Sequence, residues 1–152
     1  MNEIMIKFCL SFIILLTSCG SASHPRPPSD IAVEFQSYYY QFMQDMADYR
    51  KSVISRSVVI KFDKMTNKGS IAECHYSQPR HTIKVQKAYW NASSDTTKRI
   101  IMYHELGHCI LYRGHNDEKD SLGRPLSIMY PKIIPASLFR VNKEYYLNEL
   151  MN

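Results

Sequence analysis

The sequence predicts an α+β domain with an N-terminal helix, a short, mixed and twisted sheet, a long central helix and a C-terminal helix. Three observations support this class. Apolar residues recur at helical spacing between Ile31 and Tyr49, three short strand-like runs precede residue 86, and helical spacing returns after Asn91. The length of 152 residues and the 45% apolar content suit one compact domain.

An apolar run close to the N-terminus is expected to be a signal peptide. Residues 8–16 are apolar and follow Lys7, but a helix needs about 20 residues to span a bilayer. Leu16-Thr17-Ser18-Cys19 then matches the lipobox of bacterial lipoproteins. We predict a signal peptide over residues 1–18, with an uncleaved anchor or a chance apolar start as the alternative.

The lipobox reading makes Cys19 the acylated N-terminus of the mature protein. Residues 19–29, with three prolines and several serines, would form a spacer between the lipid and a folded domain over residues 30–152. We therefore expect a lipid-anchored protein of the bacterial cell envelope. Gly20 in place of aspartate after the cysteine points to the outer membrane.

The first helix is expected from Ile31 to Tyr49, capped by Ser29 or Asp30. A last helix is expected from Ser137 to Leu150, after the helix-breaking prolines. Between the first helix and the long one, the sequence predicts strands over residues 58–62, 71–76 and 82–85.

The long helix, expected to end near Arg113, carries the pattern H-E-x-x-H over residues 104–108. Residues four apart lie about 40° apart around a helix axis, so His104 and His108 can reach one metal ion. Glu105 points close enough to reach a water molecule on that metal. Two imidazoles and a neighbouring carboxylate are the arrangement of zinc hydrolases, so Zn²⁺ is the expected cofactor.

Two further motifs extend this pattern. Gly114 and His115 follow within a few residues, and Ser127-Ile128-Met129-Tyr130-Pro131 lies beyond them. The combination resembles the metzincin zinc peptidases, in which a third histidine follows and a turn containing methionine lies beneath the metal. The resemblance implies a small metzincin-like zincin domain. It implies His104, His108 and His115 as zinc ligands, Glu105 as general base and Met129 as the Met-turn methionine.

One residue separates this chain from the usual metzincin spacing. That spacing would place glycine at Leu111 and the third histidine at Gly114, whereas here Gly114 precedes His115. We expect the helix to run on by one residue, with Gly114 supplying the backbone geometry that a helix end needs.

The third ligand has alternatives. Asp117 could ligate the metal, or it could hold His115 through the second ring nitrogen. Glu144 or Glu149 of the last helix could serve instead, as in gluzincins, although the Met-turn disfavours that reading.

The third strand suggests a place for substrate. In metzincins an edge strand above the cleft pairs with extended peptide. By that resemblance, residues 82–86 form either the strand that binds substrate or a purely structural strand.

Four cysteines occur, and two are assigned to the N-terminal segment, Cys9 to the signal peptide and Cys19 to the lipid. In an exported protein the remaining two, Cys74 and Cys109, commonly pair, and a bridge between the second strand and the zinc helix would brace the site. The alternative is two buried free thiols.

The leading functional hypothesis is a zinc-dependent endopeptidase acting on peptide or protein. The alternatives are a gluzincin-type peptidase and a membrane-tethered, non-catalytic binding protein whose zinc stabilises the fold. The net charge of +5 is not concentrated in a Lys/Arg run, so we expect no nucleic-acid partner. We also expect a monomer.

Overall fold

The computed structural model describes residues 30–49 and 57–152. The predicted signal peptide, the acylated Cys19 and the spacer over residues 19–29 lie outside the described residues. The described part is α+β, as predicted, with five helices and a three-stranded mixed sheet. Its elements are α1 (Val33–Asp48), β1 (Val58–Phe62), β2 (Ala72–His75), β3 (His81–Val85), α2 (Lys87–Ala92), α3 (Asp95–Cys109), α4 (Ala136–Val141) and α5 (Lys143–Met151).

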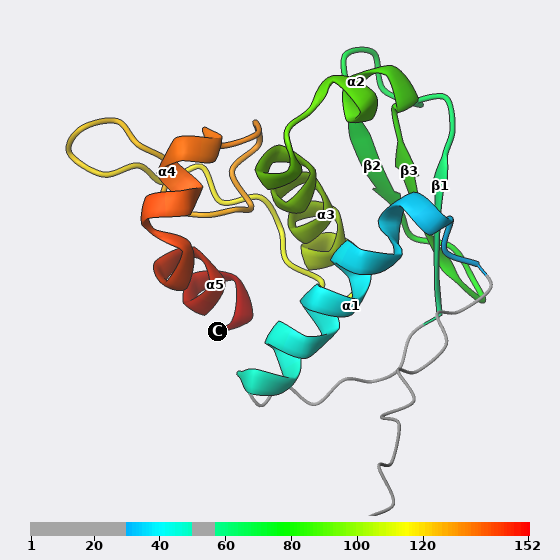
Figure 1. The fold of residues 1–152 in the computed structure, drawn as a ribbon, viewed down its shortest axis with the longest axis horizontal. Coiled ribbons are helices and arrows are strands. Elements are labelled where there is room, and N and C mark those ends of the chain that lie inside the picture. The colour runs from blue at the N-terminus through cyan, green and yellow to red at the C-terminus, as the bar shows by residue number, and fades with distance from the viewer. Residues whose placement is uncertain (1–29, 50–56) are drawn as a thin grey trace, which may run out of the picture.

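Helix α3 is the central element of the fold. The sheet lies on one side of it, α4 and α5 lie on the other, and α1 crosses it (Figure 1). Burial on all sides explains why α3 is apolar around most of its circumference, with Ile100, Tyr103 and Leu106 fully buried. The Tyr103 hydroxyl donates to Asp45 of α1 and so ties the two helices together. The histidine-bearing helix is therefore a rigid support.

The strand order is β1-β3-β2, with β1 parallel and β2 antiparallel to β3. The sequence placed the third strand at the sheet edge, and this prediction is wrong. Residues 81–85 pair on both sides, so the proposed substrate strand over residues 82–86 has no free edge. The edge strand beside α3 is β2. In the described sheet, β3 lies between β1, with which it pairs parallel, and β2, with which it pairs antiparallel.

The chain enters the domain beside β1. The Ala32 amide donates to the Ile60 carbonyl and the Ile60 amide donates to the Asp30 carbonyl, each at 3.0 Å. Helix α1 therefore begins at Val33 with Ala32 at the N-cap position, which makes no side-chain cap bond. The predicted cap Asp30 pairs with Arg80 instead, and Ser29 lies outside the described residues.

Helix α3 begins as predicted but ends early. The Ser94 hydroxyl accepts a hydrogen bond from the Thr97 amide, a normal N-cap. The last helical residue is Cys109, four residues before the expected end. The left-handed residue of the exit turn is Tyr112, with φ of 56°, and Gly114 has no positive φ. The prediction that Gly114 supplies the turn geometry is therefore wrong.

The C-terminal helix is divided. Asn142, with φ of −119° and ψ of 30°, separates α4 from α5, so the single helix expected from Ser137 to Leu150 does not form. The break changes the buried face. Val141 is exposed, whereas Phe139 and Tyr146 are buried against the core.

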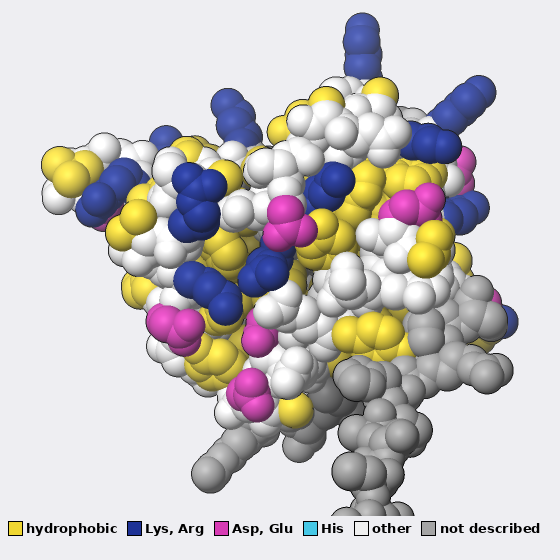
Figure 2. Space-filling view, in the orientation of Figure 1, with side chains coloured by type: hydrophobic (Ala, Val, Ile, Leu, Met, Phe, Trp, Pro, Cys, Tyr) yellow, Lys and Arg dark blue, Asp and Glu magenta, His cyan; other side chains and the backbone are white. Residues whose placement is uncertain are grey.

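The surface gives little indication of a partner. Lys and Arg side chains are spread over the face shown in Figure 2, with Asp and Glu among them. Within the described residues, no helix combines the length and the apolar character that crossing a membrane requires.

Candidate metal centre

Three imidazoles from two parts of the chain meet at one point. His104 and His108 project from α3, and His115 approaches from the segment that follows the helix. The Nε2 atom of His104 lies 3.1 Å from Nε2 of His108 and 3.3 Å from Nε2 of His115. Two nitrogen ligands about 2.05 Å from a tetrahedral ion are separated by about 3.3 Å. The spacing is therefore that of three ligands around one zinc-sized cation.

Hydrogen bonds to the other ring nitrogens fix which nitrogen carries the proton. Nδ1 of His104 donates to the Ile128 carbonyl at 2.8 Å, and Nδ1 of His108 donates to the Arg113 carbonyl at 2.6 Å. A carbonyl can only accept, so in the neutral rings both protons lie on Nδ1. The two Nε2 atoms then face each other with lone pairs, and a bound cation would satisfy both.

The pKa values of His104, which is buried, and His108, which is half-buried, support the neutral form. Burial lowers the pKa of His104 to about 4, against the opposing effect of its bond to the Ile128 carbonyl. Burial also lowers the pKa of His108, against its bond to the Arg113 carbonyl. Neutral imidazole is the form that binds metals, so both rings are ready to ligate at neutral pH.

The alternative ligands do not join this group. Among the described residues, the sets of metal-ligating side chains close enough to share an ion include neither Asp117 nor Glu144 nor Glu149. Asp117 and Glu144 are exposed. The Glu149 carboxylate is occupied by two other partners, described below.

The turn containing Met129 is held against α3 and the third histidine. The Asn116 amide donates to the Met129 carbonyl at 2.9 Å, which fixes the residue next to His115. Met129 is fully buried, and a Cβ at Gly107 of α3 would lie 2.5 Å from its sulfur. Glycine at position 107 is thus what allows the methionine to pack directly against the helix between the two histidines.

Glu149 of α5 connects the supports of two histidines. One carboxylate oxygen accepts from Arg113 Nη2 and the other accepts from the Ser127 hydroxyl, both at 2.6 Å. Arg113 supplies the carbonyl that holds His108, and Ser127 precedes Ile128, whose carbonyl holds His104. The Glu149 carboxylate therefore joins the residues whose backbone orients both rings, together with the bonds of Arg113 to the Glu149 and Leu150 carbonyls.

Glu105 is 6% exposed and faces the edge strand. Its carboxylate accepts a hydrogen bond from the Cys74 amide of β2. Burial raises the pKa of Glu105 to about 8, although the Cys74 amide opposes the shift. A cation bound by the histidines would act in the same direction as that amide. The carboxyl is thus placed to exchange protons near neutral pH.

A cleft of about 650 Å³ opens onto the three histidines and Glu105. One wall is β2 with the turn before it, and the other is the segment 131–133. Glu73 of β2 holds that turn, because its carboxylate accepts from the Thr66 and Asn67 amides at 2.9 and 2.6 Å. Burial would raise the pKa of Glu73, but these bonds and His75 lower it to about 2. The cleft wall is therefore fixed by an ionised carboxylate at neutral pH.

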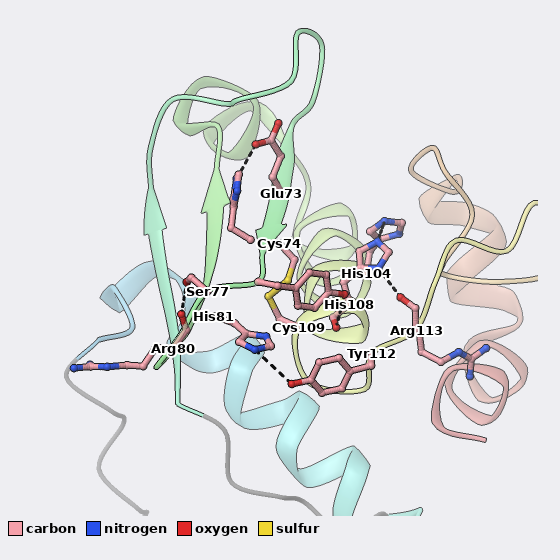
Figure 3. The surroundings of a disulfide bond; sticks show 12 residues. Glu73, Cys74, Ser77, Arg80, His81, His104, His108, Cys109, Tyr112 and Arg113 are labelled. Carbon is pink, nitrogen blue, oxygen red and sulfur yellow. Dashed lines mark hydrogen bonds and ion pairs between the residues drawn. A yellow bond between two sulfur atoms is a disulfide. The ribbon is translucent and has the colours of Figure 1, made fainter.

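Cys74 and Cys109 form a disulfide, the first of the two alternatives drawn from the sequence. The bond links the edge strand to the residue after His108 (Figure 3). The Tyr76 hydroxyl donates to the His108 carbonyl at 3.0 Å and adds a second link between the same elements.

The sequence did not reveal the residues that support the site. Arg113, Gly107 and Glu73 were not singled out, and Glu149 was considered only as a ligand. One sequence feature could have drawn attention to Arg113, which is the only charged residue between His108 and His115. Gly107 and Glu149 take their roles from contacts between distant segments, which no local pattern encodes. Glu73 contacts residues within seven positions, but its role depends on the fold of the turn that it holds.

The chain matches no protein-family model, no curated protein and no solved structure. The functional interpretation therefore depends on the geometry of the site itself.

Proposed function

We propose that the protein is a zinc-dependent endopeptidase with a metzincin-like ligand set of His104, His108 and His115. The observation that carries the proposal is the convergence of three Nε2 atoms at ligand spacing, with two of the rings held in the metal-binding tautomer by backbone carbonyls. Three protein ligands leave one position open on a tetrahedral ion, which is typical of catalytic zinc and not of structural zinc.

Zinc bound at this position would supply a Lewis acid that lowers the pKa of water and polarises an amide carbonyl. Glu105 would accept the proton of the attacking water and return it to the leaving amine. Its burial and its bond from the Cys74 amide hold the carboxylate in one orientation. The lowered pKa values of His104 and His108 favour neutral rings, whose ligand nitrogens are available to a metal.

The cleft supports a peptide as substrate. Its wall contains β2, the edge strand, whose outer side faces α3 through the Cys74 amide. An extended peptide could add to this edge by main-chain hydrogen bonds and place one carbonyl over the histidines. We propose β2, in place of residues 82–86, as the strand that aligns substrate.

The disulfide and the lipobox together support an exported, lipid-anchored protein. Disulfides form and persist in oxidising compartments outside the cytosol. We propose that acylated Cys19 tethers the catalytic domain to the surface of an envelope membrane.

The first test is zinc content together with hydrolysis of a mixed peptide library by the purified chain. We expect about one zinc per chain, cleavage of library peptides, loss of cleavage on chelation and recovery with added zinc. Zinc binding without cleavage of any peptide would favour a non-catalytic, zinc-stabilised protein. A chain without zinc would contradict the site.

Replacing Glu149 by alanine is expected to weaken zinc binding by about 10- to 100-fold, the usual effect of losing a residue that orients ligands. The variant leaves all three histidines in place and removes the carboxylate contacts of Arg113 and Ser127, although Arg113 keeps its bonds to the Glu149 and Leu150 carbonyls. Competition with a chromophoric chelator measures the affinity. Glu144→Ala on the same helix is the matched control, because Glu144 is exposed. Equal zinc affinity in the two variants would show that Glu149 does not support the site.

A further inference from the structure

A second group of metal-ligating side chains lies behind the disulfide. Cys74, His81 and Cys109 each offer one ligand atom, and the three atoms lie within 4.8 Å of one another. In Figure 3, His81 lies on the opposite side of the disulfide from His104 and His108. This group is therefore distinct from the histidine site, although it shares α3 with it.

His81 has an unused ring nitrogen at this position. The residue is only 8% exposed, and within the described part of the chain its Nδ1 is buried without a hydrogen-bond partner. The other nitrogen, Nε2, lies 3.4 Å from the Tyr112 hydroxyl. A buried polar atom without a partner is unfavourable and uncommon in folded proteins. The sulfur atoms of an intact disulfide are poor hydrogen-bond partners for Nδ1, whereas a metal ion bound by the same cysteines would accept its lone pair.

The His81 ring of this group can be reached from solvent. His81 lines a cavity of about 400 Å³ together with Tyr76, Ser77, Gln78 and Tyr112. The rings of Tyr76 and Tyr112 are about half exposed and stack on each other with centroids 5.9 Å apart. A metal ion could reach His81 beside this pair, and the Tyr112 hydroxyl would orient the imidazole from its far nitrogen. A reductant could reach the disulfide from the other side, because Cys74 lines the cleft of the three histidines.

We propose that Cys74, Cys109 and His81 form a redox-gated zinc site, closed by the disulfide and opened by reduction. A dithiol reductant supplies two electrons, the bond between the two cysteine sulfurs breaks, and the reductant forms its own disulfide. The two thiols release their protons to solvent as they bind Zn²⁺, and neutral His81 donates a lone pair. Two thiolates and one imidazole are a known ligand set for zinc, with a fourth position left for water.

The proposed site would keep β2 joined to α3 in both redox states of the two cysteines. Cys74 belongs to β2, and its amide donates to Glu105, while Cys109 follows His108 on α3. In the oxidised chain the disulfide joins these elements. In the reduced chain a bound metal would join them through the same two sulfur atoms, so the edge strand would remain beside the zinc helix.

Cobalt(II) tests the proposal, because thiolate ligands give an intense sulfur-to-cobalt charge-transfer band that histidine ligands do not. The complete chain is titrated anaerobically with Co²⁺, before and after treatment with a phosphine reductant. We expect no such band from the oxidised chain, and a band that saturates at one additional Co²⁺ per reduced chain. His81→Ala should weaken cobalt binding at the thiolate site at least tenfold. His75→Ala, on the neighbouring strand, should not.

Three results would overturn the proposal. The first is a reduced chain without the charge-transfer band, and the second is equal cobalt affinity in wild type and His81→Ala. The third is loss of the far-ultraviolet circular dichroism of the fold on reduction even with Co²⁺ present. His115→Ala separates this site from the proposed catalytic one. The charge-transfer band should persist in that variant, and its disappearance would mean that cobalt binds the cysteines together with the histidine triad.

Discussion

Replacing Glu105 by glutamine is expected to lower kcat/KM for peptide hydrolysis by about 10³-fold while zinc stays bound. General acid-base catalysis contributes about 10² to 10⁴ in rate, and the amide cannot accept the proton of the attacking water. Glutamine has nearly the same shape, and its oxygen can still accept from the Cys74 amide. The three histidines keep their own supports. Initial rates on a peptide found in the library measure the loss, and metal analysis of the same sample measures zinc.

The variant should also be no less stable than the wild type. Burial raises the pKa of Glu105 above its ordinary value, so the charged form is unfavourable in the folded state before a metal binds. The cost grows as the pH rises from the ordinary pKa of a glutamate to the raised pKa of about 8 and is complete above it, so removing the ionisable group relieves it over that range. Glu118→Gln, at an exposed position, is the matched control. Hydrolysis by Glu105→Gln at the rate of this control would contradict the role of Glu105.

Replacing His115 by alanine is expected to weaken zinc binding by more than the 100-fold that loss of a supporting residue typically costs. Only two ligands would remain, both on α3. Hydrolysis at a fixed, limiting zinc concentration should fall in proportion to the zinc lost. Equilibrium dialysis against buffered zinc measures the affinity, and the peptide assay measures the activity.

Asp117→Ala serves as the control, because Asp117 is two residues away and exposed. The comparison also separates two ligand sets. If His115→Ala kept tight zinc and full activity, the metzincin-like assignment would be wrong, and a carboxylate from another segment would have to complete the site. If Asp117→Ala instead lost zinc, Asp117 would be the ligand.

Local patterns in the sequence predicted the first helix and the three strands well, whereas α2 was not predicted. The apolar stripe of α1 and the three strands were each found within about two residues of their observed bounds. His104 and His108 were predictable because four residues make about one helical turn, so the spacing alone places both rings on one face.

The order of the strands could not be predicted from local patterns. The alternation in residues 82–85 is compatible with a central or an edge strand, because both bury one face. Only the pairing of β2 with β3 decides which strand reaches the cleft. The prediction of the turn after α3 was wrong for a related reason. Gly114 was the residue with the greatest intrinsic freedom, yet the turn occurs at Tyr112, whose ring stacks on Tyr76 and packs against His81.

The supporting contacts were beyond sequence reasoning because they join segments far apart in the chain. Glu149 reaches Arg113 across 36 residues and Ser127 across 22. A glutamate in an amphipathic helix carries no signal that distinguishes this role from an exposed one. The structure distinguishes them by contact, since Glu149 makes both bonds and Glu144 is exposed.

The contact between Arg113 and Glu149 has a consequence for the order of events during synthesis. The three histidines and Glu105 leave the ribosome within 12 residues of one another, well before α5. Until α5 follows, Arg113 and Ser127, which precede or supply the carbonyls that orient His108 and His104, lack their contacts with Glu149. In the proposed zinc peptidase, tight binding of the metal would therefore begin only after α5 has docked on the rest of the domain.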